Sequence, residues 1–195
     1  MPLVNKKIGL YFGSFNPVHT GHLIIASQLL ENSDLDQIWF VVSPQNPLKK
    51  KKSLLNNHHR LMLVKEAIEE DDRFRVSDIE FQLPYPSYTI HTLAVLSEKY
   101  PERQFSLIMG SDNLATLHKW KNYREILNQY YLYVYPRPGY DPGERSSHPH
   151  VQLVDAPQME ISASMIREGI RKNKDMRYLL PDKVLKYIQE MQFYQ

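Results

Sequence analysis

The sequence predicts an α/β fold: a Rossmann-like, doubly wound parallel sheet with C-terminal helices packed on it. Short apolar runs alternate along the chain with segments in which apolar residues recur every three or four positions, a pattern that indicates strands separated by helices. The apolar runs are nearly continuous, as expected for strands whose two faces are both covered. Turns of special composition follow four of these runs.

The expected strands are short runs rich in β-branched and aromatic residues. In chain order they read KIGLYF, QIWFVVS, FRVSDIE, FSLIMG, YLYVYP and VQLVD, at residues 7–12, 37–43, 74–80, 105–110, 131–136 and 151–155.

The expected helices lie between and after these runs. Thr20 is suited to cap the first, in which Leu23, Ala26 and Leu30 recur at helical spacing. The others are expected at 57–71, 87–100, 112–117, 122–129, 163–172 and 181–191. The segment 139–150 is expected to be a mobile loop.

The composition of the chain excludes several classes of protein. We expect one domain over residues 1–195, with a C-terminal helical part from about 160 to 195. The 24 basic and 22 acidic residues nearly balance, which is not typical of a nucleic-acid-binding protein. The chain has no cysteine, so disulfides, thiolate metal sites and a cysteine nucleophile are excluded. No run approaches the ~18 apolar residues of a membrane span, and a cytoplasmic protein is expected.

Four unusual turns are expected at one edge of the sheet. GSFNPVHTGH, SPQNPLKK, GSDN and RPGY each follow a strand, at residues 13–22, 43–50, 110–113 and 137–140. In doubly wound sheets, ligands bind beyond the carboxyl ends of the strands, where the strand order reverses. The sequence therefore predicts a ligand site at this edge.

The first turn has the residues of a phosphate site, although the usual phosphate-binding glycine patterns are absent. Gly13 allows close approach of the backbone to a ligand. Gly21 opens a helix whose first amides are expected to be free for an anion. His19 and His22 stand at that helix start and can donate to phosphate oxygens. A zinc site is less suitable because no third ligand lies nearby.

A second anion site is expected in EISASMIREGIRKN, residues 160–173. With Ser162 as N-cap, Ile161 and Ile166 occupy the positions of a hydrophobic staple. Ser164 then lies in the first turn, and Arg167 shares its face. A hydroxyl, amides and a guanidinium suit a polyphosphate. An ordinary capped helix with an exposed arginine is equally compatible with this segment alone.

The two motifs together resemble the nucleotidylyltransferase superfamily with the H-x-G-H signature, and most of all its nicotinate mononucleotide adenylyltransferases. PSYTIHTL, GSDNLATLHKW and YPRPGY are similar to further motifs of these enzymes, in the expected order from about residue 8 onward. Ser14, Asn16 and Leu48 depart from the family pattern.

The resemblance implies transfer of AMP from ATP to nicotinate mononucleotide, giving deamido-NAD and pyrophosphate, with Mg²⁺ held mainly by phosphates and water and no metal-ligating residue. No general base is required because the attacking phosphate is already ionised. By this likeness His19, His22 and Arg167 are catalytic. The ATP-binding residues would be Gly13, Ser14, Phe15, Lys49, Gly110, Asp112 and Ser164, and the mononucleotide-binding residues Asn46, Thr89 and Trp120.

Other functions remain open at this stage. Phosphopantetheine adenylyltransferases and small cytidylyltransferases share H-x-G-H, but the motifs around Thr89 and Trp120 argue against them. An aminoacyl-tRNA synthetase core would need a different lysine-containing loop and a more basic surface. Nicotinamide mononucleotide is an alternative acceptor, and a nucleotide-sensing module without catalysis is an alternative of another class. The sequence leaves the oligomeric state open.

Overall fold

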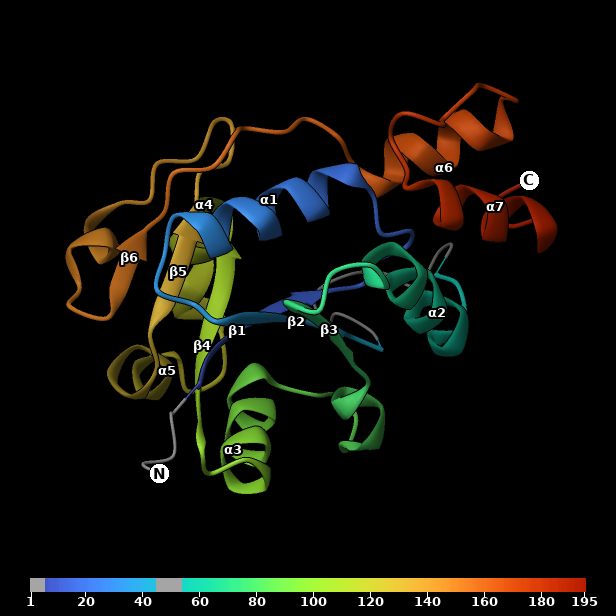
Figure 1. Cartoon of the computed structure of the whole chain (residues 1–195). Helices are drawn as coiled ribbons and strands as arrows, with labels where there is room; N and C mark the ends of the chain where they lie inside the picture. Colours follow the sequence, from blue (N-terminus) through green and yellow to red (C-terminus); the bar gives the residue numbers. More distant parts are fainter. Residues whose placement is uncertain (1–5, 45–53) are drawn as a thin grey trace.

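The computed structural model describes residues 6–44 and 54–195, and a six-stranded sheet forms its centre (Figure 1). The strands are β1 (Lys6–Gly13), β2 (Gln37–Val42), β3 (Phe74–Ser77), β4 (Arg103–Gly110), β5 (Leu132–Tyr135) and β6 (Val151–Leu153). Every neighbouring pair is parallel, in the order β3-β2-β1-β4-β5-β6. The order reverses between β1 and β4, so a ligand crevice is expected beyond the carboxyl ends of these strands.

Helices cover both faces of the sheet. They are α1 (Thr20–Glu31), α2 (Asn57–Ile68), α3 (Thr89–Lys99), α4 (Ser111–Thr116), α5 (Tyr123–Gln129), α6 (Ala163–Arg171) and α7 (Asp182–Glu190). Short 3₁₀ turns lie at Ile79–Gln82, Leu117–Lys119 and Glu144–Ser147. In Figure 1, α1 lies on one side of the sheet and α3 on the other. The predicted α/β, Rossmann-like fold is confirmed.

Successive strand residues point into two different hydrophobic cores, as the period of a strand requires. Tyr11 and Phe40 join the core that α1, α2, α6 and α7 share. Leu10 and Val41, their sequence neighbours, join the core that α3, α4 and α5 share. This burial on both faces explains why the strands are almost continuously apolar.

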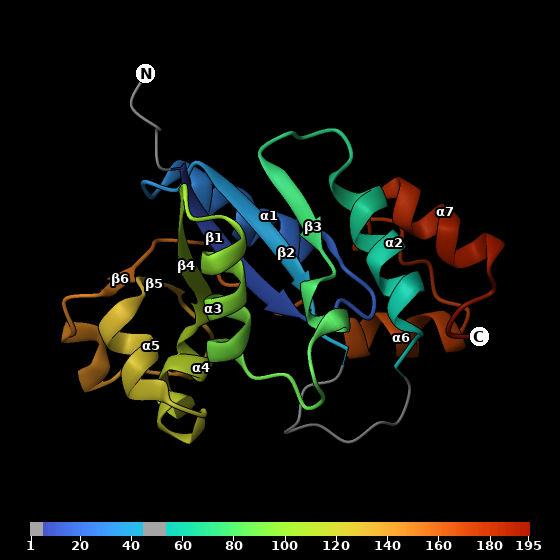
Figure 2. The same cartoon turned by 90° about the horizontal axis from the view of Figure 1, so that it is seen from below.

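The helices α6 and α7 are fixed to the rest of the molecule through the first core. Ile166 of α6 and Val184 and Ile188 of α7 are almost completely buried. Burial of each such side chain contributes about 1.5–3 kcal/mol. Figure 2 shows α7 beside α2, in agreement with their contacts. The backbone N–H of Thr20 donates to Leu179 O (3.0 Å), so the segment between α6 and α7 also contacts the start of α1.

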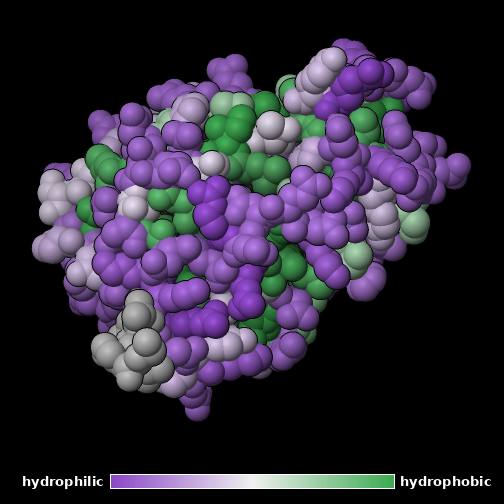
Figure 3. Space-filling view, in the orientation of Figure 1, coloured by the Kyte–Doolittle hydropathy of each residue, from purple (hydrophilic) through white to green (hydrophobic). Residues whose placement is uncertain are grey.

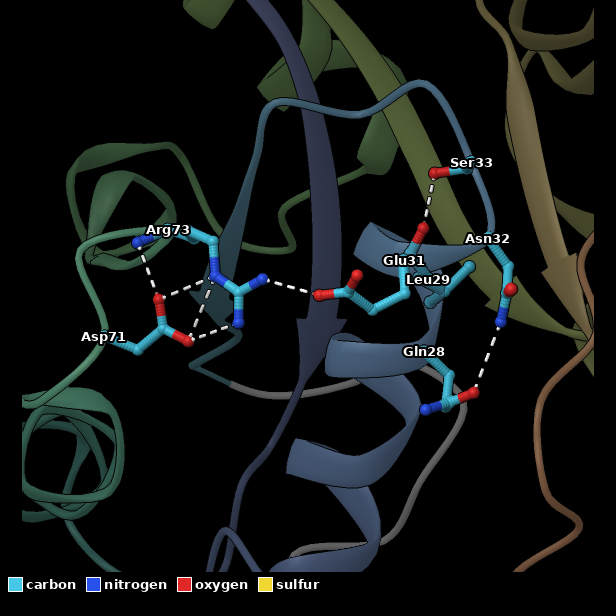
Figure 4. A network of polar contacts seen from close by, with 7 residues as sticks. All are labelled: Gln28, Leu29, Glu31, Asn32, Ser33, Asp71 and Arg73. Carbon is cyan, nitrogen blue, oxygen red and sulfur yellow. Dashed lines mark hydrogen bonds and ion pairs between the residues drawn. The ribbon is translucent and has the colours of Figure 1, made fainter.

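The far end of α1 is joined to the turn before β3 by a polar network (Figure 4). Arg73 donates to both carboxylate oxygens of Asp71 and, at 2.7 Å, to Glu31. These side chains are about half exposed, and such ion pairs contribute only about 0–1 kcal/mol. Apolar burial, rather than this network, therefore holds α1 on the sheet.

Two expected elements end three residues earlier than predicted. The run 74–80 is a strand only to Ser77, because Ile79 and Glu80 turn into the interior as part of a 3₁₀ turn. The helix expected to end at Asp71 ends at Ile68. The segment 139–150 contains the 3₁₀ turn Glu144–Ser147, and its mobility stays a prediction.

No helix among residues 6–44 and 54–195 is long and apolar enough to cross a membrane. Hydrophilic side chains cover most of the molecular face in Figure 3, and the hydrophobic ones on it form small separate groups.

Candidate active site

The loop between β1 and α1 is folded around the ring of Phe15. This side chain is 2% exposed, and its backbone has a positive φ of 44°. A Cβ atom on Gly13 would lie 2.8 Å from Phe15 Cζ, closer than carbon atoms can pack. The glycine is thus required by the Phe15 ring, and its close approach to a ligand stays a prediction.

Two stacked imidazoles lie at the start of α1. The ring centroids of His19 and His22 are 3.7 Å apart. The backbone N–H of His19 donates to His22 Nδ1 at 3.2 Å. Since Nδ1 accepts, the proton of neutral His22 is on Nε2, which is therefore the ring nitrogen that can donate. His19 Nδ1 is buried without a hydrogen-bond partner in the described part of the chain.

The N-cap of α1 is His19, not Thr20 as expected. Thr20 is the first helical residue, and its N–H is already bonded to Leu179 O. One of the amides expected to be free for an anion is therefore used within the protein. A Cβ on Gly21 would lie 3.1 Å from His19 Nδ1 and 3.5 Å from Ile161 Cβ. A Cβ at position 21 would therefore crowd His19, while its distance from Ile161 is an ordinary van der Waals contact.

Burial keeps both imidazoles neutral at pH 7. It lowers the pKa of His19 to about 4, and the Arg137 cation acts in the same direction. The pKa of His22 is also well below its usual range because of burial, then His19, then Arg137. The pair can therefore offer N–H donors to a phosphate but carries no positive charge of its own.

Arg137 supplies a cation beside this pair. It follows β5, and its guanidinium lies over the ring of Tyr135, 5.4 Å from the centroid. The Tyr135 hydroxyl is 3.4 Å from that of Tyr11, whose ring contacts His22. The sequence analysis had noted RPGY at this edge but assigned Arg137 no role. Its position directly after a strand was the signal that could have identified it.

Gly110 and Asp112 lie next to Arg137. Asp112 Oδ1 and Arg137 Nε are 3.8 Å apart, and neither atom has a hydrogen-bond partner in the described residues. A Cβ on Gly110 would be 2.3 Å from Asp112 Oδ1 and 2.8 Å from Arg137 Cγ. Only glycine at position 110 allows these two charged side chains to approach, and both retain unused hydrogen-bonding capacity.

The start of α6 reaches the same loop. Ser162 caps the helix by accepting from Met165 N–H (3.2 Å), as predicted. Arg167 donates through Nη2 to Ser164 Oγ (3.1 Å) and through Nη1 to the carbonyl of Asn16 (2.7 Å). Asn16 precedes His19 by three residues, so the serine–arginine motif and the histidine motif lie side by side although about 150 residues separate them.

A cavity of about 370 Å³ adjoins the carboxyl ends of β1 and β4. Thr89, Trp120, Lys119 and Lys121 are among its lining residues. Gly13 and Ser14 line the same cavity. Trp120 is partly exposed and packs on the second core with the rest of its surface. The space has aromatic, cationic and polar walls and borders the loop that carries the histidines.

Glu80 forms part of the wall of this cavity and was not identified from the sequence. It is 4% exposed and accepts a hydrogen bond from Thr92 Oγ1 (2.9 Å). Burial raises its pKa, while hydrogen bonds from Ser43, Thr92 and Ser87 oppose that rise. Through Ser87 the carboxyl group holds the segment that leads into Thr89. Because residues 74–80 were predicted to be one strand, the 3₁₀ turn that contains Glu80 was not predicted.

Arg60 is a third residue that was not identified from the sequence. Its side chain is fully buried in α2, and burial lowers its pKa to about 10, so it remains charged at pH 7. It donates to the carbonyls of Ser14, Ser43 and Pro44 at 2.6, 2.7 and 3.1 Å. A single guanidinium thus joins the loops that follow β1 and β2. Asn46, Leu48 and Lys49 lie outside the described residues.

Comparison with known proteins first identifies the class of enzymes to which the chain belongs. Residues 10–169 match the family model described as cytidylyltransferase-like, a class of nucleotidyltransferases. Curated relatives identify a narrower family. Proteins named "Probable nicotinate-nucleotide adenylyltransferase" from Flavobacterium johnsoniae and Bacteroides thetaiotaomicron are 54% and 50% identical to this chain. The matches cover 96% and 94% of this chain, and 98% and 91% of the relatives. The chain belongs to the nicotinate-nucleotide adenylyltransferases of this class, which act in NAD biosynthesis.

Solved structures support the fold. The nicotinic acid mononucleotide adenylyltransferase of Plasmodium falciparum, complexed with NaAD, aligns with a TM-score of 0.81 at 20% identity. The alignment covers 97% of this chain and 98% of that one. A putative nicotinate-nucleotide adenylyltransferase from Vibrio parahaemolyticus aligns with a TM-score of 0.71, also at 20% identity.

Proposed function

We propose that this chain transfers AMP from ATP to nicotinate mononucleotide, giving deamido-NAD and pyrophosphate. The observation that carries the proposal is the 2.7 Å hydrogen bond from Arg167 to the Asn16 carbonyl. It brings the serine–arginine helix start to the loop of His19 and His22, an arrangement suited to one triphosphate. The family assignment of the chain supports the same reaction.

In the proposed reaction, a phosphate oxygen of the mononucleotide attacks the α-phosphorus of ATP. The bond from that phosphorus to the bridging oxygen breaks, and pyrophosphate leaves. The attacking oxygen needs no general base because the second pKa of such a phosphate is about 6. Catalysis then consists of alignment and charge stabilisation.

Each residue on the phosphate side has a proposed part. His19 and His22 donate to phosphate oxygens, while Arg167 and Ser164 hold the β,γ end. Gly110 and Asp112 lie at the ribose, where Asp112 Oδ1, which has no hydrogen-bond partner in the described residues, can accept from a hydroxyl. Arg137 is added to this set because its charge acts on both imidazoles.

The remaining ATP contacts are proposed for the loops after β1 and β2. Gly13, Ser14 and Phe15 shape the first loop, and Lys49 adds a cation from the second. Asn46 is proposed at the mononucleotide.

The cavity beside this site is proposed to bind the mononucleotide. The exposed part of Trp120 can stack on the pyridine ring, and the backbone at Thr89 can bind its substituent. Lys119 and Lys121 line the cavity together with Trp120. Two ammonium groups near the ring favour an acceptor with a carboxylate over one with a neutral amide. The two ammonium groups therefore support nicotinate mononucleotide rather than nicotinamide mononucleotide as the acceptor.

Mg²⁺ is the proposed metal cofactor. In the described residues, no group of three or more His, Asp and Glu side chains could hold a metal ion. The phosphate side offers imidazole and guanidinium donors, so the ion would be held by the triphosphate and water, as Mg²⁺ commonly is. When bound, it neutralises charge that develops on the phosphates.

A pyrophosphate-release assay tests the proposal. The protein is incubated with ATP and Mg²⁺ and, separately, nicotinate mononucleotide, nicotinamide mononucleotide or phosphopantetheine. The expected result is the highest kcat/KM with nicotinate mononucleotide. A higher value with another acceptor contradicts the proposed substrate, and ATP binding without turnover of any acceptor indicates a nucleotide sensor.

The expected cytoplasmic location is a separate prediction, which fractionation of the source cells tests.

A further inference from the structure

The residues that follow α7 return to the β1–α1 loop. Phe193 packs edge-on against His59 of α2, with ring centroids 4.8 Å apart, and against Tyr187 of α7, at 5.9 Å. These contacts direct the next residue, Tyr194, towards the phosphate side of the site. Its ring packs against the first core and is only partly exposed.

The Tyr194 hydroxyl donates to Asn16 Oδ1 at 2.8 Å, across 178 positions of sequence. Asn16 is 3% exposed, and its Oδ1 also accepts from the backbone N–H of Leu55 at 3.2 Å. Two donors on one oxygen determine which way the amide of Asn16 faces. The backbone carbonyl of the same residue accepts from Arg167 Nη1.

Asn16 therefore joins Tyr194 to the arginine of the proposed triphosphate site. Burial raises the pKa of the Tyr194 phenol, so the hydroxyl remains a donor at neutral pH. Without it, Asn16 Oδ1 would lose one of its two described donors, and the amide would be held less firmly in its orientation. The carbonyl that fixes Arg167 would then be less well ordered.

We propose that Tyr194 is a positioning residue for ATP: its hydroxyl orients Asn16 and thereby holds Arg167 and the loop of His19 in place. This inference rests on the proposed function for its kinetic consequences. It concerns ATP alone, because the contacts of Tyr194 lie on the phosphate side and not among the residues of the cavity.

The variant Tyr194→Phe removes the hydroxyl and keeps the ring. We expect the KM and the Kd for ATP to rise about fivefold, the range of one lost hydrogen bond, with the KM for the mononucleotide unchanged. Tyr178→Phe is the matched control, because Tyr178 is 88% exposed. In an Arg167→Gln background, Tyr194→Phe should have little further effect on the Kd for ATP, because the two residues act through one connection.

Three results would overturn the inference: an unchanged Kd for ATP in Tyr194→Phe, equal rises in both KM values together with a lower melting temperature, or full additivity with Arg167→Gln. Calorimetric ATP binding is measured without an acceptor. If the wild-type chain bound ATP but turned over no acceptor, the proposed function would fail while the binding comparison still decided the role of Tyr194.

Discussion

We propose that the stacked imidazoles of His19 and His22 act as neutral donors rather than as charges. Their low pKa values follow from burial and from Arg137, and the proton of His22 is on Nε2 because Nδ1 accepts from backbone. A donor held rigidly before the reaction stabilises developing charge without having to reorganise. Among the described residues on the phosphate side, Arg137 and Arg167 carry positive charge.

The variant His19→Ala should lower kcat by about 10²-fold or more, the usual effect of losing one such donor. The circular-dichroism spectrum should remain that of the wild type. Steady-state kinetics measure the effect, and His58→Ala, at an exposed position of α2, is the control. A kcat equal to that of the wild type would remove His19 from the mechanism.

The low pKa of His19 predicts a pH dependence of stability. The imidazole titrates near 6.5 in the unfolded chain and near 4 in the folded one, so the unfolded state takes up its proton first as the pH falls. Stability from this group is therefore complete above pH 6.5 and is lost between about pH 6.5 and 4. The free energy of unfolding should decrease over this range by less in His19→Gln than in the wild type. Equal slopes would show that His19 is not held neutral.

Trp120→Ala tests the aromatic wall of the cavity. Loss of stacking and apolar contact should raise the KM for the mononucleotide by about tenfold, or 1.4 kcal/mol. The KM for ATP should change little, since the histidine pair and the Ser164–Arg167 pair are not among the residues that line the cavity. Both constants are measured in one kinetic series, and equal increases in the two would argue against stacking.

At the scale of elements, α2 acts on the site through Arg60. Its guanidinium connects the loops after β1 and β2 by bonds to three carbonyls, and two more donors reach Leu55 O and Asn57 Oδ1. All of these described partners are uncharged. The helix therefore holds the start of the loop after β1 close to the start of the loop after β2.

Arg60→Met should destabilise the protein by about 3 kcal/mol, because several buried carbonyls lose their donors. Denaturant unfolding gives this free energy. Arg177→Met, in an exposed ion pair, should cost less than about 1 kcal/mol. A similar small loss at Arg60 would contradict the role given to it.

Elements could be predicted from the sequence where they depend on interactions between residues that are close together in the chain. The cap at Ser162 and its neighbours Ser164 and Arg167 were identified from sequence because capping and helical spacing involve only adjacent turns. β3 was predicted too long because the hydrogen bonds of Glu80 come from Thr92 and other distant residues. Arg60 and Tyr194 were missed for the same reason, since their partners are far away in sequence.

At the scale of the whole molecule, the central position of β1 and the packing of α6 and α7 bring the histidine motif and the serine–arginine motif together. β1 lies in the middle of the sheet, and α6 and α7 pack through the first core against the helices on one face. As a result, Arg167 reaches the loop that follows β1. The strand pattern and both motifs were predicted from the sequence. The distance between the two motifs could not be predicted, because it depends on how α6 and α7 pack against the rest of the molecule.

A crystal structure with a non-hydrolysable ATP analogue and Mg²⁺ tests this arrangement most directly. We expect one triphosphate whose oxygens lie within hydrogen-bond distance, about 2.7–3.2 Å, of both the His19–His22 pair and the Ser164–Arg167 pair. A triphosphate that touched only one of these pairs, or bound elsewhere on the molecule, would contradict the shared site on which the mechanism depends.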